Sequence, residues 1–493
     1  MKINKSSGII FHPTSLPGKY GIGDFGLHSY EFVDMLSASG TKVWQVLPLG
    51  FTDNAEFSPY SSTSSLLGNP YIVALDNLNN ELINKDELKT FSDLSNSEVE
   101  FQKVYTKKND VFKNIGKIVN INEPEYQNFL KNDLIRKHIT FITLNEVFDK
   151  NWNLWNKDYL HFDENLYEEI ITNYKNIFAK HLFIQYEFKQ QWQKLKSYAN
   201  KKNVSILGDI PIYVNHNSAD VWLNKKLFDL DKEHKMEFVS GAVPDDFTTD
   251  GQIWNTTLYK WENHLEDDYK YWKEKLNSSL SNFDYLRIDH FIGLFKYWAI
   301  PFEQSALKGQ WREGPWKTFF NNISKDVDFN KLLAEDLGVE LQETSEILNK
   351  YDIPGMKVLQ QRIPDTDNHD EIHPNNWNEN VAAYTGTHDS PTIKQWFLET
   401  NKEQIEHFKI YNNESNFKFK SDVWNFISLT WQSPCKLAVT NVQDLLELGS
   451  EGRFNLPGTK ENNWKWRIED LSEIEKPLET LKQLNKDTDR FNT

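Results

Sequence analysis

The chain has 493 residues, of which 39% are hydrophobic and 14% aromatic, and this composition excludes a disordered or low-complexity protein. The length is roughly twice that of one ordinary α/β barrel, so the chain holds either two domains or one barrel with large insertions. Its 72 acidic and 55 basic side chains give a formal net charge of −17, which would repel nucleic acid and an anionic membrane, and we exclude both as partners.

Eight short apolar runs, rich in β-branched and aromatic residues, each end in a polar cluster, which is typical of strands that helices cover on both faces. In chain order they span residues 7–11, 43–47, 204–214, 285–288, 332–334, 356–359, 381–384 and 437–439. Segments with helical spacing, such as 29–39 and 269–280, lie between many of them. This alternation predicts parallel strands joined by crossover helices, and eight such units indicate an α/β fold, the (β/α)8 TIM barrel.

The gap between the second and third runs is much longer than one crossover helix needs. It is rich in Asn, Lys and Glu, and it contains helical stretches such as 165–200. We therefore expect a single catalytic barrel unit over residues 1–493 that carries an inserted, mainly helical subdomain at approximately 75–200.

One cysteine, Cys435, is present, and it can neither form an internal disulfide nor build a thiolate metal site by itself, which fits a reducing compartment. The stretch 1–13 is too weakly apolar for a signal-peptide core, and no stretch approaches the length needed to span a bilayer. We expect a cytoplasmic protein. Nothing in the sequence indicates an oligomeric state.

Acidic residues stand directly after three of the predicted strands, which is where the active sites of barrels gather. They are Asp289 in YLRIDHF, Glu335 with Asp336 in LLAEDLG, and Asp389 in YTGTHDS. One such acid alone is more often a helix cap or an ion-pair partner. Three together favour a catalytic cluster.

The neighbours of these acids indicate different protonation states. Arg287 lies two residues before Asp289, so both side chains point to one face of an extended strand and the guanidinium favours an ionised carboxylate. Glu335 is expected one strand further round the barrel, partly desolvated among other acids, and both conditions favour its neutral form. A retaining glycosidase uses such a pair, about 5 Å apart, as nucleophile and acid. His388 and Asp389 would then bind sugar hydroxyls and stabilise the cationic transition state.

Two aromatic residues lie in polar loops, Tyr60 in SPYSSTSS and Trp254 in DGQIWN. Each is as consistent with a platform for a sugar ring as with an anchor for its own loop. The chain has no Walker loop, no GxGxxG after a strand, and no HExxH or zinc-like histidine spacing. We therefore expect neither a metal nor an organic cofactor.

The motifs, taken as a set, resemble those of the amylomaltases, the 4-α-glucanotransferases of the α-amylase superfamily. The stretches that carry the resemblance follow one another along almost the whole chain: SGIIFHPTSLPGKYGIGDFG, WQVLPLG, SPYSSTSSLLGNPY, GDIPIYVNHNSADVW, YLRIDHFIGLF, LLAEDLG, PGMKVLQ, YTGTHD, and RFNLPGT with NWKWR. Their number and their order make the resemblance specific.

The resemblance implies roles for individual residues. Asp289 matches the family's catalytic nucleophile, Glu335 its acid/base, and Asp389 its transition-state stabiliser. Arg287 and His388 match contacts to the substrate or to the catalytic groups. The positions that match the lining of the family's glucan cleft are Ser58, Tyr60, Asp209, Gln252, Trp254, His290 and Asp336.

The resemblance further implies a cofactor-free enzyme whose partners are maltooligosaccharides and other α-1,4-glucans. Such an enzyme cleaves an α-1,4 link, keeps the glucan as a glycosyl-enzyme, and passes it to the 4-hydroxyl of an acceptor glucan or glucose. Two alternatives stay open at this point. An α-1,4-glucan hydrolase would use the same carboxylates, whereas the cluster of three acids argues against an inactive maltodextrin-binding protein.

Some positions depart from the family pattern, and the largest departures surround Trp254. AVPDDF at 242–247 replaces a paired-proline stretch, and Asn-Thr-Thr at 255–257 replaces Gly-Asn-Pro. We therefore expect a changed loop path over the cleft, with a shifted acceptor length or a shifted ratio of transfer to hydrolysis. The smaller departures are Ser61, where Gln is usual, and Ser390 and Gln395, where Asn and Gly are common.

Overall fold

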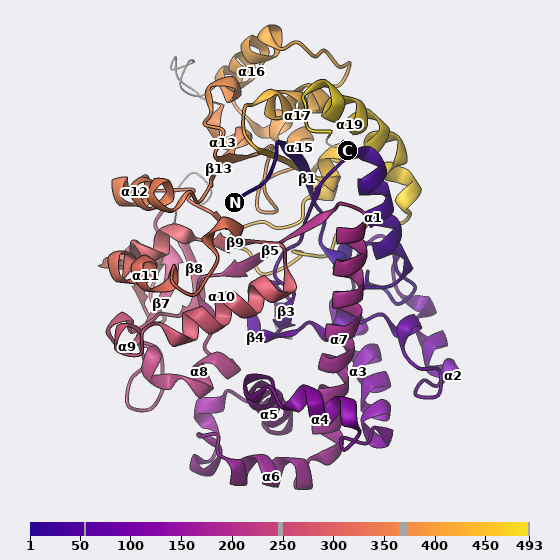
Figure 1. Cartoon of the computed structure of the whole chain (residues 1–493), viewed down its shortest axis with the longest axis vertical. Helices are drawn as coiled ribbons and strands as arrows, with labels where there is room; N and C mark the ends of the chain where they lie inside the picture. Colours follow the sequence, from indigo (N-terminus) through magenta and orange to yellow (C-terminus); the bar gives the residue numbers. More distant parts are fainter. Residues whose placement is uncertain (54–55, 245–249, 364–372, 492–493) are drawn as a thin grey trace.

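A computed structural model of the chain describes residues 1–53, 56–244, 250–363 and 373–491 (Figure 1). Its centre is a parallel eight-stranded sheet in the order β12-β9-β5-β2-β1-β15-β14-β13. The strands are β1 (Ser6–Ile10), β2 (Val43–Gln45), β5 (Ser205–Pro211), β9 (Tyr285–Asp289), β12 (Leu332–Ala334), β13 (Gly355–Val358), β14 (Val381–Tyr384) and β15 (Leu437–Asn441). Each strand lies beside its successor among these eight, so the sheet curls into the predicted (β/α)8 barrel.

The sheet nearly closes between β12 and β13. The amide of Ala334 donates to the carbonyl of Pro354 at 2.9 Å, and the amide of Met356 donates to Oδ1 of Asp336 at 2.7 Å. All eight predicted strands are therefore confirmed. The predicted run 204–214 is divided, because β5 ends at Pro211, which has no amide hydrogen to continue the ladder.

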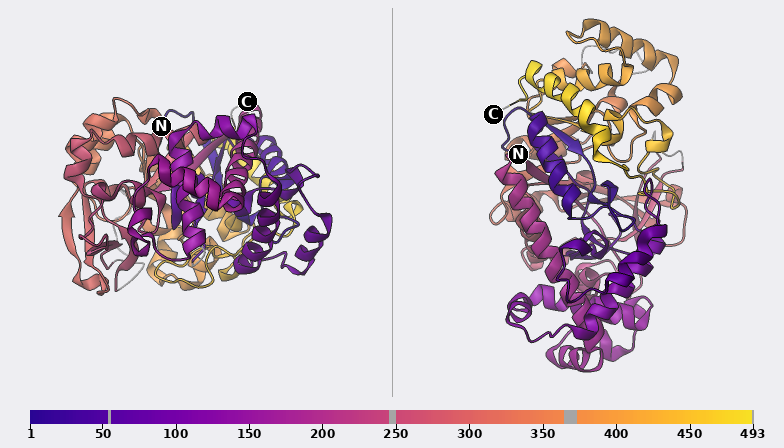
Figure 2. Two further views of the ribbon diagram at one scale, coloured as in Figure 1. Left: turned by 90° about the horizontal axis from the view of Figure 1, so that it is seen from below. Right: turned by 90° about the vertical axis from the view of Figure 1, so that its right-hand side faces the viewer.

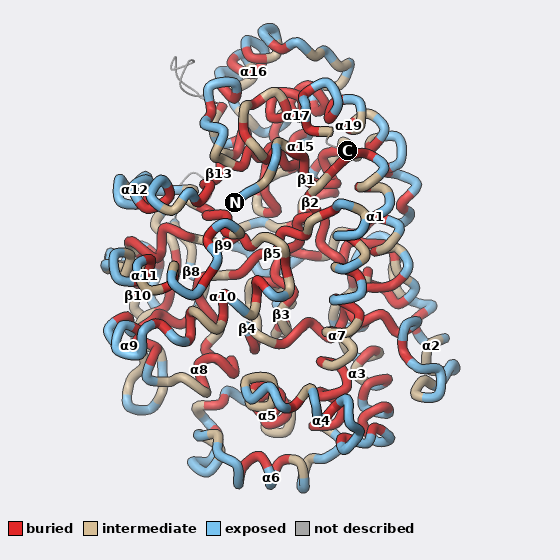
Figure 3. Tube along the Cα trace, in the orientation of Figure 1, coloured by how far each residue is buried: buried red, intermediate tan, exposed pale blue. Residues whose placement is uncertain are grey.

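The barrel strands are apolar throughout because both of their faces are buried. Leu207, Leu333 and Val439 point into the barrel and share one interior cluster. Ile206 and Ile288, adjacent in sequence to inward positions, belong to the outer cluster that packs under the helices. Figure 3 shows that much of the centre is buried and that many of the exposed segments lie around the periphery. Continuous rather than alternating hydrophobicity is the pattern of a parallel sheet covered on both sides.

Helices surround the barrel on its outside. The long ones that flank it are α1 (Leu27–Ser39), α10 (Lys270–Asn282), α11 (Trp316–Ile323), α12 (Gln342–Tyr351), α15 (Ile393–Glu399), α16 (Lys402–Glu414), α17 (Asp422–Gln432) and α19 (Glu475–Asp487). The predicted helical segments 29–39 and 269–280 coincide with α1 and α10. The C-terminal helix α19 packs against α1, which places the end of the chain beside its first helix (Figures 1 and 2).

Between β4 (Ser62–Gly68) and β5 the chain is mostly helical. It forms α2 (Lys85–Lys89), α3 (Phe101–Ile118), α4 (Pro124–Leu130), α5 (Asp133–Phe148), α6 (Glu164–Asn173) and the long α7 (Lys175–Lys201). Helices α3 to α6 gather at the end of the molecule opposite α16 (Figures 1 and 2). Helix α7 packs against α3 and α5 and also against α1 and β5, so it joins this segment to the barrel. The subdomain limits of 75 and 200 stay a prediction.

A second, smaller sheet follows the carboxyl ends of β5 and β9. Its order is β11-β10-β7-β8-β6, and its strands are β6 (Val214–Asn215), β7 (Phe238–Ala242), β8 (Gln252–Thr257), β10 (Lys296–Pro301) and β11 (Gln310–Glu313). The sequence interpretation predicts helical insertions and does not predict this sheet. Its strands pair across long separations, as β7 does with β10, and local periodicity carries no such information.

No helix in the part of the chain that the structure describes is both long and apolar enough to cross a bilayer.

Candidate active site

A cleft with a volume of about 1040 Å³ opens at the carboxyl ends of the barrel strands, beside the small sheet. Of the residues that the sequence singled out, those that line it are Ser58, Tyr60, Gln252, Trp254, Arg287, Asp289, His290, Glu335, His388 and Asp389. Asp209 and Asp336 do not line it. The three acids predicted as catalytic are therefore brought to one cleft from β9, β12 and β14.

A buried arginine organises the β5 and β9 side of the cleft. Arg287 lies directly opposite Asp209 in the ladder, and its Nη1 contacts Oδ2 of Asp209 at 2.6 Å and Oδ1 of Asp289 at 2.8 Å. Tyr60 donates from its hydroxyl to the same Oδ2 of Asp209 at 2.8 Å. Burial raises the pKa of Asp209 to about 6, although Arg287 opposes this shift. Asp209 thus acts behind the cleft, where it orients Arg287 and Tyr60.

Glu335 follows β12 and lies beside the end of β9, because its amide donates to the carbonyl of Ile288 at 3.0 Å. Its two carboxyl oxygens accept hydrogen bonds from backbone amides, Oε2 from His290 at 2.6 Å and Oε1 from Leu337 at 2.9 Å. Burial raises the pKa of Glu335 to about 8, and the charge of Asp289 adds to the effect, although Arg287 opposes it. The buried surroundings of Glu335 therefore favour the neutral form of its carboxyl group.

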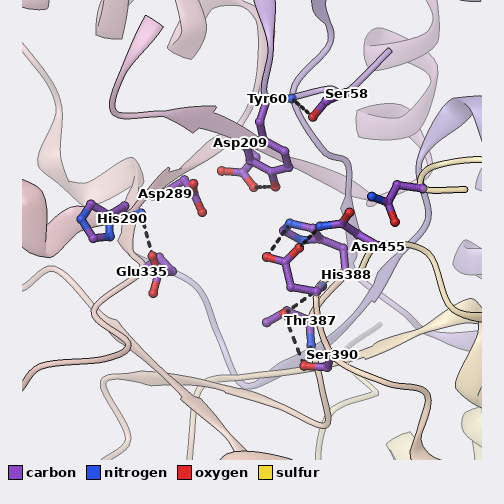
Figure 4. A network of polar contacts seen from close by, with 12 residues as sticks. Ser58, Tyr60, Asp209, Asp289, His290, Glu335, Thr387, His388, Ser390 and Asn455 are labelled. Carbon is purple, nitrogen blue, oxygen red and sulfur yellow. Dashed lines mark hydrogen bonds and ion pairs between the residues drawn. The ribbon is translucent and has the colours of Figure 1, made fainter. Parts of the chain in front are cut away.

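The pKa of Asp389 is shifted in the opposite direction from that of Glu335. Burial alone would raise its pKa, but His388, whose Nε2 lies 3.1 Å from Oδ2, and Asn455, which donates to Oδ1 at 2.6 Å, hold the pKa of Asp389 at about 2. Arg453 also donates to its backbone carbonyl at 3.2 Å. Figure 4 shows His388 and Asn455 across from the group formed by Asp289, His290 and Glu335. Asp389 thus presents a permanent negative charge to the cleft.

The sequence alone indicates no role for Asn455 or Arg453, although both lie in the RFNLPGT motif. The motif indicated that the segment mattered. It did not indicate which residue of the barrel the segment contacts.

Aromatic rings line the cleft on two sides and pack against histidine rings there. Tyr60 stacks on His388 with ring centroids 5.0 Å apart and an interplanar angle of 16°. On the small sheet, the ring of Trp254 meets His290 edge to face at 4.7 Å, and its Nε1 donates to Oε1 of Gln252 at 3.0 Å. Burial lowers the pKa of His290 to about 4, so this ring is neutral at pH 7. Tyr60 and Trp254 are thus packed into the site and also line its open space.

The family model described as 4-alpha-glucanotransferase matches residues 11–472 of this chain. The chain belongs to the 4-alpha-glucanotransferase family. Similar curated proteins carry that name, and the chain shares 38% identity with the one from Clostridium butyricum, over 93% of this chain and 95% of the other. It shares 36% with the one from Aquifex aeolicus, over 94% and 95%. We therefore describe the protein as a 4-alpha-glucanotransferase, an enzyme that transfers glucan units.

Solved structures agree with this assignment. The amylomaltase from Streptococcus agalactiae in complex with acarbose superimposes with a TM-score of 0.91 at 32% identity, and the match covers 99% of this chain and 100% of that one. The amylomaltase from Corynebacterium glutamicum matches with a TM-score of 0.79 at 17% identity, over 99% of this chain and 75% of that one, and it supports the fold alone.

Two of the residues that the family resemblance places in the cleft, Asp209 and Asp336, do not line it in this glucanotransferase. Asp336 accepts from the amide of Met356 on β13 and does not line the cleft. Ser58 lines the cleft, but its hydroxyl also accepts from the amide of Tyr60 at 3.2 Å, which shapes the loop. The described residues contain no group of three or more His, Cys, Asp and Glu side chains that could hold a metal ion. The absence of a metal and of a cofactor from the reaction stays a prediction.

The residues that depart from the family pattern have defined places in the structure, whereas a changed loop path over the cleft stays a prediction. Asn255 adopts a φ of 55°, a conformation that Gly and Asn tolerate best. Thr257 is buried and pairs with both Val214 and Val239 within the small sheet. The part of AVPDDF from Asp245 to Phe247 lies outside the described residues. The small polar departures take local partners: Ser61 accepts from Asn215, Ser390 accepts from the amide of Thr387, and Gln395 donates to Glu399.

Proposed function

We propose that the enzyme works by a retaining double displacement in which Asp289 is the nucleophile, Glu335 the acid/base and Asp389 the transition-state stabiliser. In the first step a carboxylate oxygen of Asp289 bonds to the anomeric carbon, the α-1,4 bond to the leaving oxygen breaks, and Glu335 gives that oxygen its proton. In the second step the ionised Glu335 removes the proton from the 4-hydroxyl of an acceptor glucan. That oxygen then attacks the anomeric carbon and releases Asp289.

One observation carries this assignment: the two carboxyl groups at the neighbouring ends of β9 and β12 have opposite environments. Asp289 forms an ion pair with the guanidinium of Arg287 at 2.8 Å, which holds its carboxylate in place at the end of β9. Glu335 has its pKa raised to about 8, mainly by burial, which favours the neutral form that donates a proton. Because the pKa of Asp389 is held at about 2, its carboxylate is negatively charged. This charge would stabilise the oxocarbenium-like transition state.

We further propose that the donors and acceptors are maltooligosaccharides and longer α-1,4-glucans. The similar Streptococcus agalactiae amylomaltase is described in complex with acarbose, which supports a saccharide ligand for this chain. The cytoplasm is the compartment that we propose for the reaction. The buried, free thiol of Cys435 suits a reducing environment.

Pure maltotriose provides the decisive test. Transfer should give glucose together with longer maltodextrins and should leave the total of reducing ends constant, because each broken link is replaced by a new one. A steady rise in reducing ends, with maltose and glucose as the products, would instead identify a hydrolase.

The nucleophile can be tested in the same assay. Asp289→Asn should lower turnover by at least about 10³-fold while the fold and the binding of maltodextrin persist. The matched control is Asp326→Asn, an acid paired with Lys273 at 2.7 Å on the surface, which should keep normal turnover. Substantial activity in a contamination-free Asp289→Asn preparation would remove Asp289 from the role.

A further inference from the structure

The small sheet carries a row of apolar residues that the proposed mechanism does not use. Ile253 on β8, Gly241 on β7, Trp298 on β10 and Trp311 on β11 are direct partners in successive ladders, so they form one row across four strands. Residues directly opposite each other in antiparallel strands share a face of the sheet. We call these four residues the tryptophan row.

The two ends of the tryptophan row are exposed although their chemistry would favour burial, while Trp298 is half-buried and Gly241 is buried. Trp311 is 45% exposed and Ile253 44% exposed. The alternate residues of β10, Tyr297 and Ala299, point to the other face and join the main hydrophobic core. The row therefore lies on the face of the sheet that is turned away from the main core, and β10 lies near the edge of the molecule (Figure 3).

The aromatic part of the row is held rigidly. Trp298 packs on a small cluster with Val239, Ile300 and Ala306, and its Nε1 donates to the carbonyl of Ala306 at 2.8 Å. A Cβ at Gly309 would lie 2.2 Å from that Nε1, so glycine is required for this close approach. Trp311 meets Trp298 edge to face, with ring centroids 5.2 Å apart. A ligand that binds these rings would lose little affinity to their ordering.

The row is continuous with the catalytic cleft. All four of its residues line the same cavity as Asp289 and Glu335. Ile253 is next in sequence to Trp254, whose ring contacts His290, the residue after Asp289, although the two side chains lie on opposite faces of β8. From β8 to β11 the row crosses three strand spacings of about 4.8 Å, or about 14 Å in total, which is longer than one sugar ring.

We propose that the tryptophan row binds the remote part of a long α-1,4-glucan whose scissile bond lies at Asp289. This inference rests on the proposed function and adds a substrate-length determinant to it. A glucan fits the row because the C–H faces of its rings are apolar while its hydroxyls stay in water, and an indole face can cover such a ring. The polar Glu303 and Gln304, which also line the cavity, can receive the hydroxyls.

Trp311→Ala should therefore act on long substrates and spare short ones. We expect the KM for amylose to rise about 3- to 10-fold, and turnover at saturating maltotriose to stay within 2-fold, because the proposal assigns the row to the part of a long glucan that is remote from the scissile bond. Trp311→Phe should restore most of the amylose affinity. The matched control is Phe302→Ala, since Phe302 is 44% exposed beside the same sheet but does not line the cavity.

A second variant and a direct binding measurement complete the test. Ile253→Ser, at the other end of the row, should weaken amylose use in the same direction, and both variants should migrate faster than the unmodified enzyme in amylose-containing native gels. Unchanged amylose parameters in both variants would overturn the proposal. An equal loss on amylose and maltotriose would also overturn it, because this would indicate a structural defect.

Two further outcomes distinguish a failure of the row proposal from a failure of the proposed function. A change of oligomeric state in Trp311→Ala on size-exclusion chromatography, with amylose use unchanged, would show that the row faces a second copy of the chain and would overturn the proposal. An unmodified enzyme that makes no longer maltodextrins from maltotriose would refute the proposed function. The gel retardation by amylose would still test the row in that case.

Discussion

The backbone amide of His290 donates a 2.6 Å hydrogen bond to Oε2 of Glu335, so the residue that follows one proposed catalytic carboxylate fixes the position of the other. His290 has a φ of 51°, and this left-handed conformation turns the chain at the end of β9. The two acids are thus coupled through the backbone as well as through their charges. A change in the path of the chain at His290 would disturb both.

The raised pKa of Glu335 predicts an alkaline limit to activity. Glu335 is protonated below its pKa of about 8 and loses its proton above it, so kcat/KM should fall as the pH rises through about 8. In Glu335→Gln, an activated donor such as a glycosyl fluoride should still form the glycosyl-enzyme, because its leaving group needs no proton. The burst rate with that donor should then not fall as the pH rises through about 8. A fall that persists in the variant would assign the titration to another group.

The same pKa makes a prediction about stability. A carboxyl group whose pKa is raised on folding binds more protons in the native state between its unfolded pKa, about 4.3, and its native pKa, so the free energy of unfolding should decrease as the pH rises through this interval. Glu335→Gln removes the group that titrates. Urea unfolding of the two proteins should show a shallower decrease between pH 5 and pH 8 in the variant, and parallel curves would contradict the assignment.

Asn455 should affect turnover indirectly, by its hydrogen bond to Asp389. Asn455→Ala removes the 2.6 Å hydrogen bond to Oδ1, so we expect the pKa of Asp389 to rise from about 2 and turnover at neutral pH to fall about 10- to 100-fold. The acid limb of the kcat profile should move to higher pH, a change that a merely structural loss would not cause. Glu461→Gln, at an exposed position of the same loop, serves as the control. An unmoved acid limb would contradict this role.

Asp336 should contribute to stability and not to substrate binding. Its carboxylate accepts from the amide of Met356 across the seam between β12 and β13, so Asp336→Ala leaves that amide without its acceptor at a cost of about 1–3 kcal/mol. We expect a lower urea midpoint with an unchanged KM for maltotriose. A raised KM at unchanged stability would restore the cleft-lining role that the family resemblance implies.

The loop after Trp254 can be tested one position at a time. Asn255→Gly should leave the product distribution nearly unchanged, because both residues accept a φ of 55°. Thr257→Pro should destabilise the small sheet, since Thr257 pairs with strands on both sides and proline removes its amide hydrogen. Product profiles from maltotriose and from amylose measure the effect on acceptor choice. Thermal unfolding measures the loss of stability. A large change of profile in Asn255→Gly would show that residue type at 255 sets acceptor choice.

The sequence by itself determined the barrel and its three acids. The eight apolar runs are strands because a parallel sheet buried on both faces needs continuous hydrophobicity, and this requirement is visible locally. Asp289, Glu335 and Asp389 were found because the carboxyl ends of barrel strands converge, so a position along the chain predicts a position in space. Arg287 was paired with Asp289 by the two-residue period of a strand.

Only the tertiary structure decided which distant segments meet. The small sheet joins strands from two separate excursions, Asn455 reaches Asp389 across 66 residues, and Asp336 turns to Met356. Trp298 and Trp311 form a row with Ile253 only through the register of three ladders. Such contacts depend on the folding of the whole chain, because the free energy that fixes them comes from burial and pairing between segments, and no short window of sequence contains both partners.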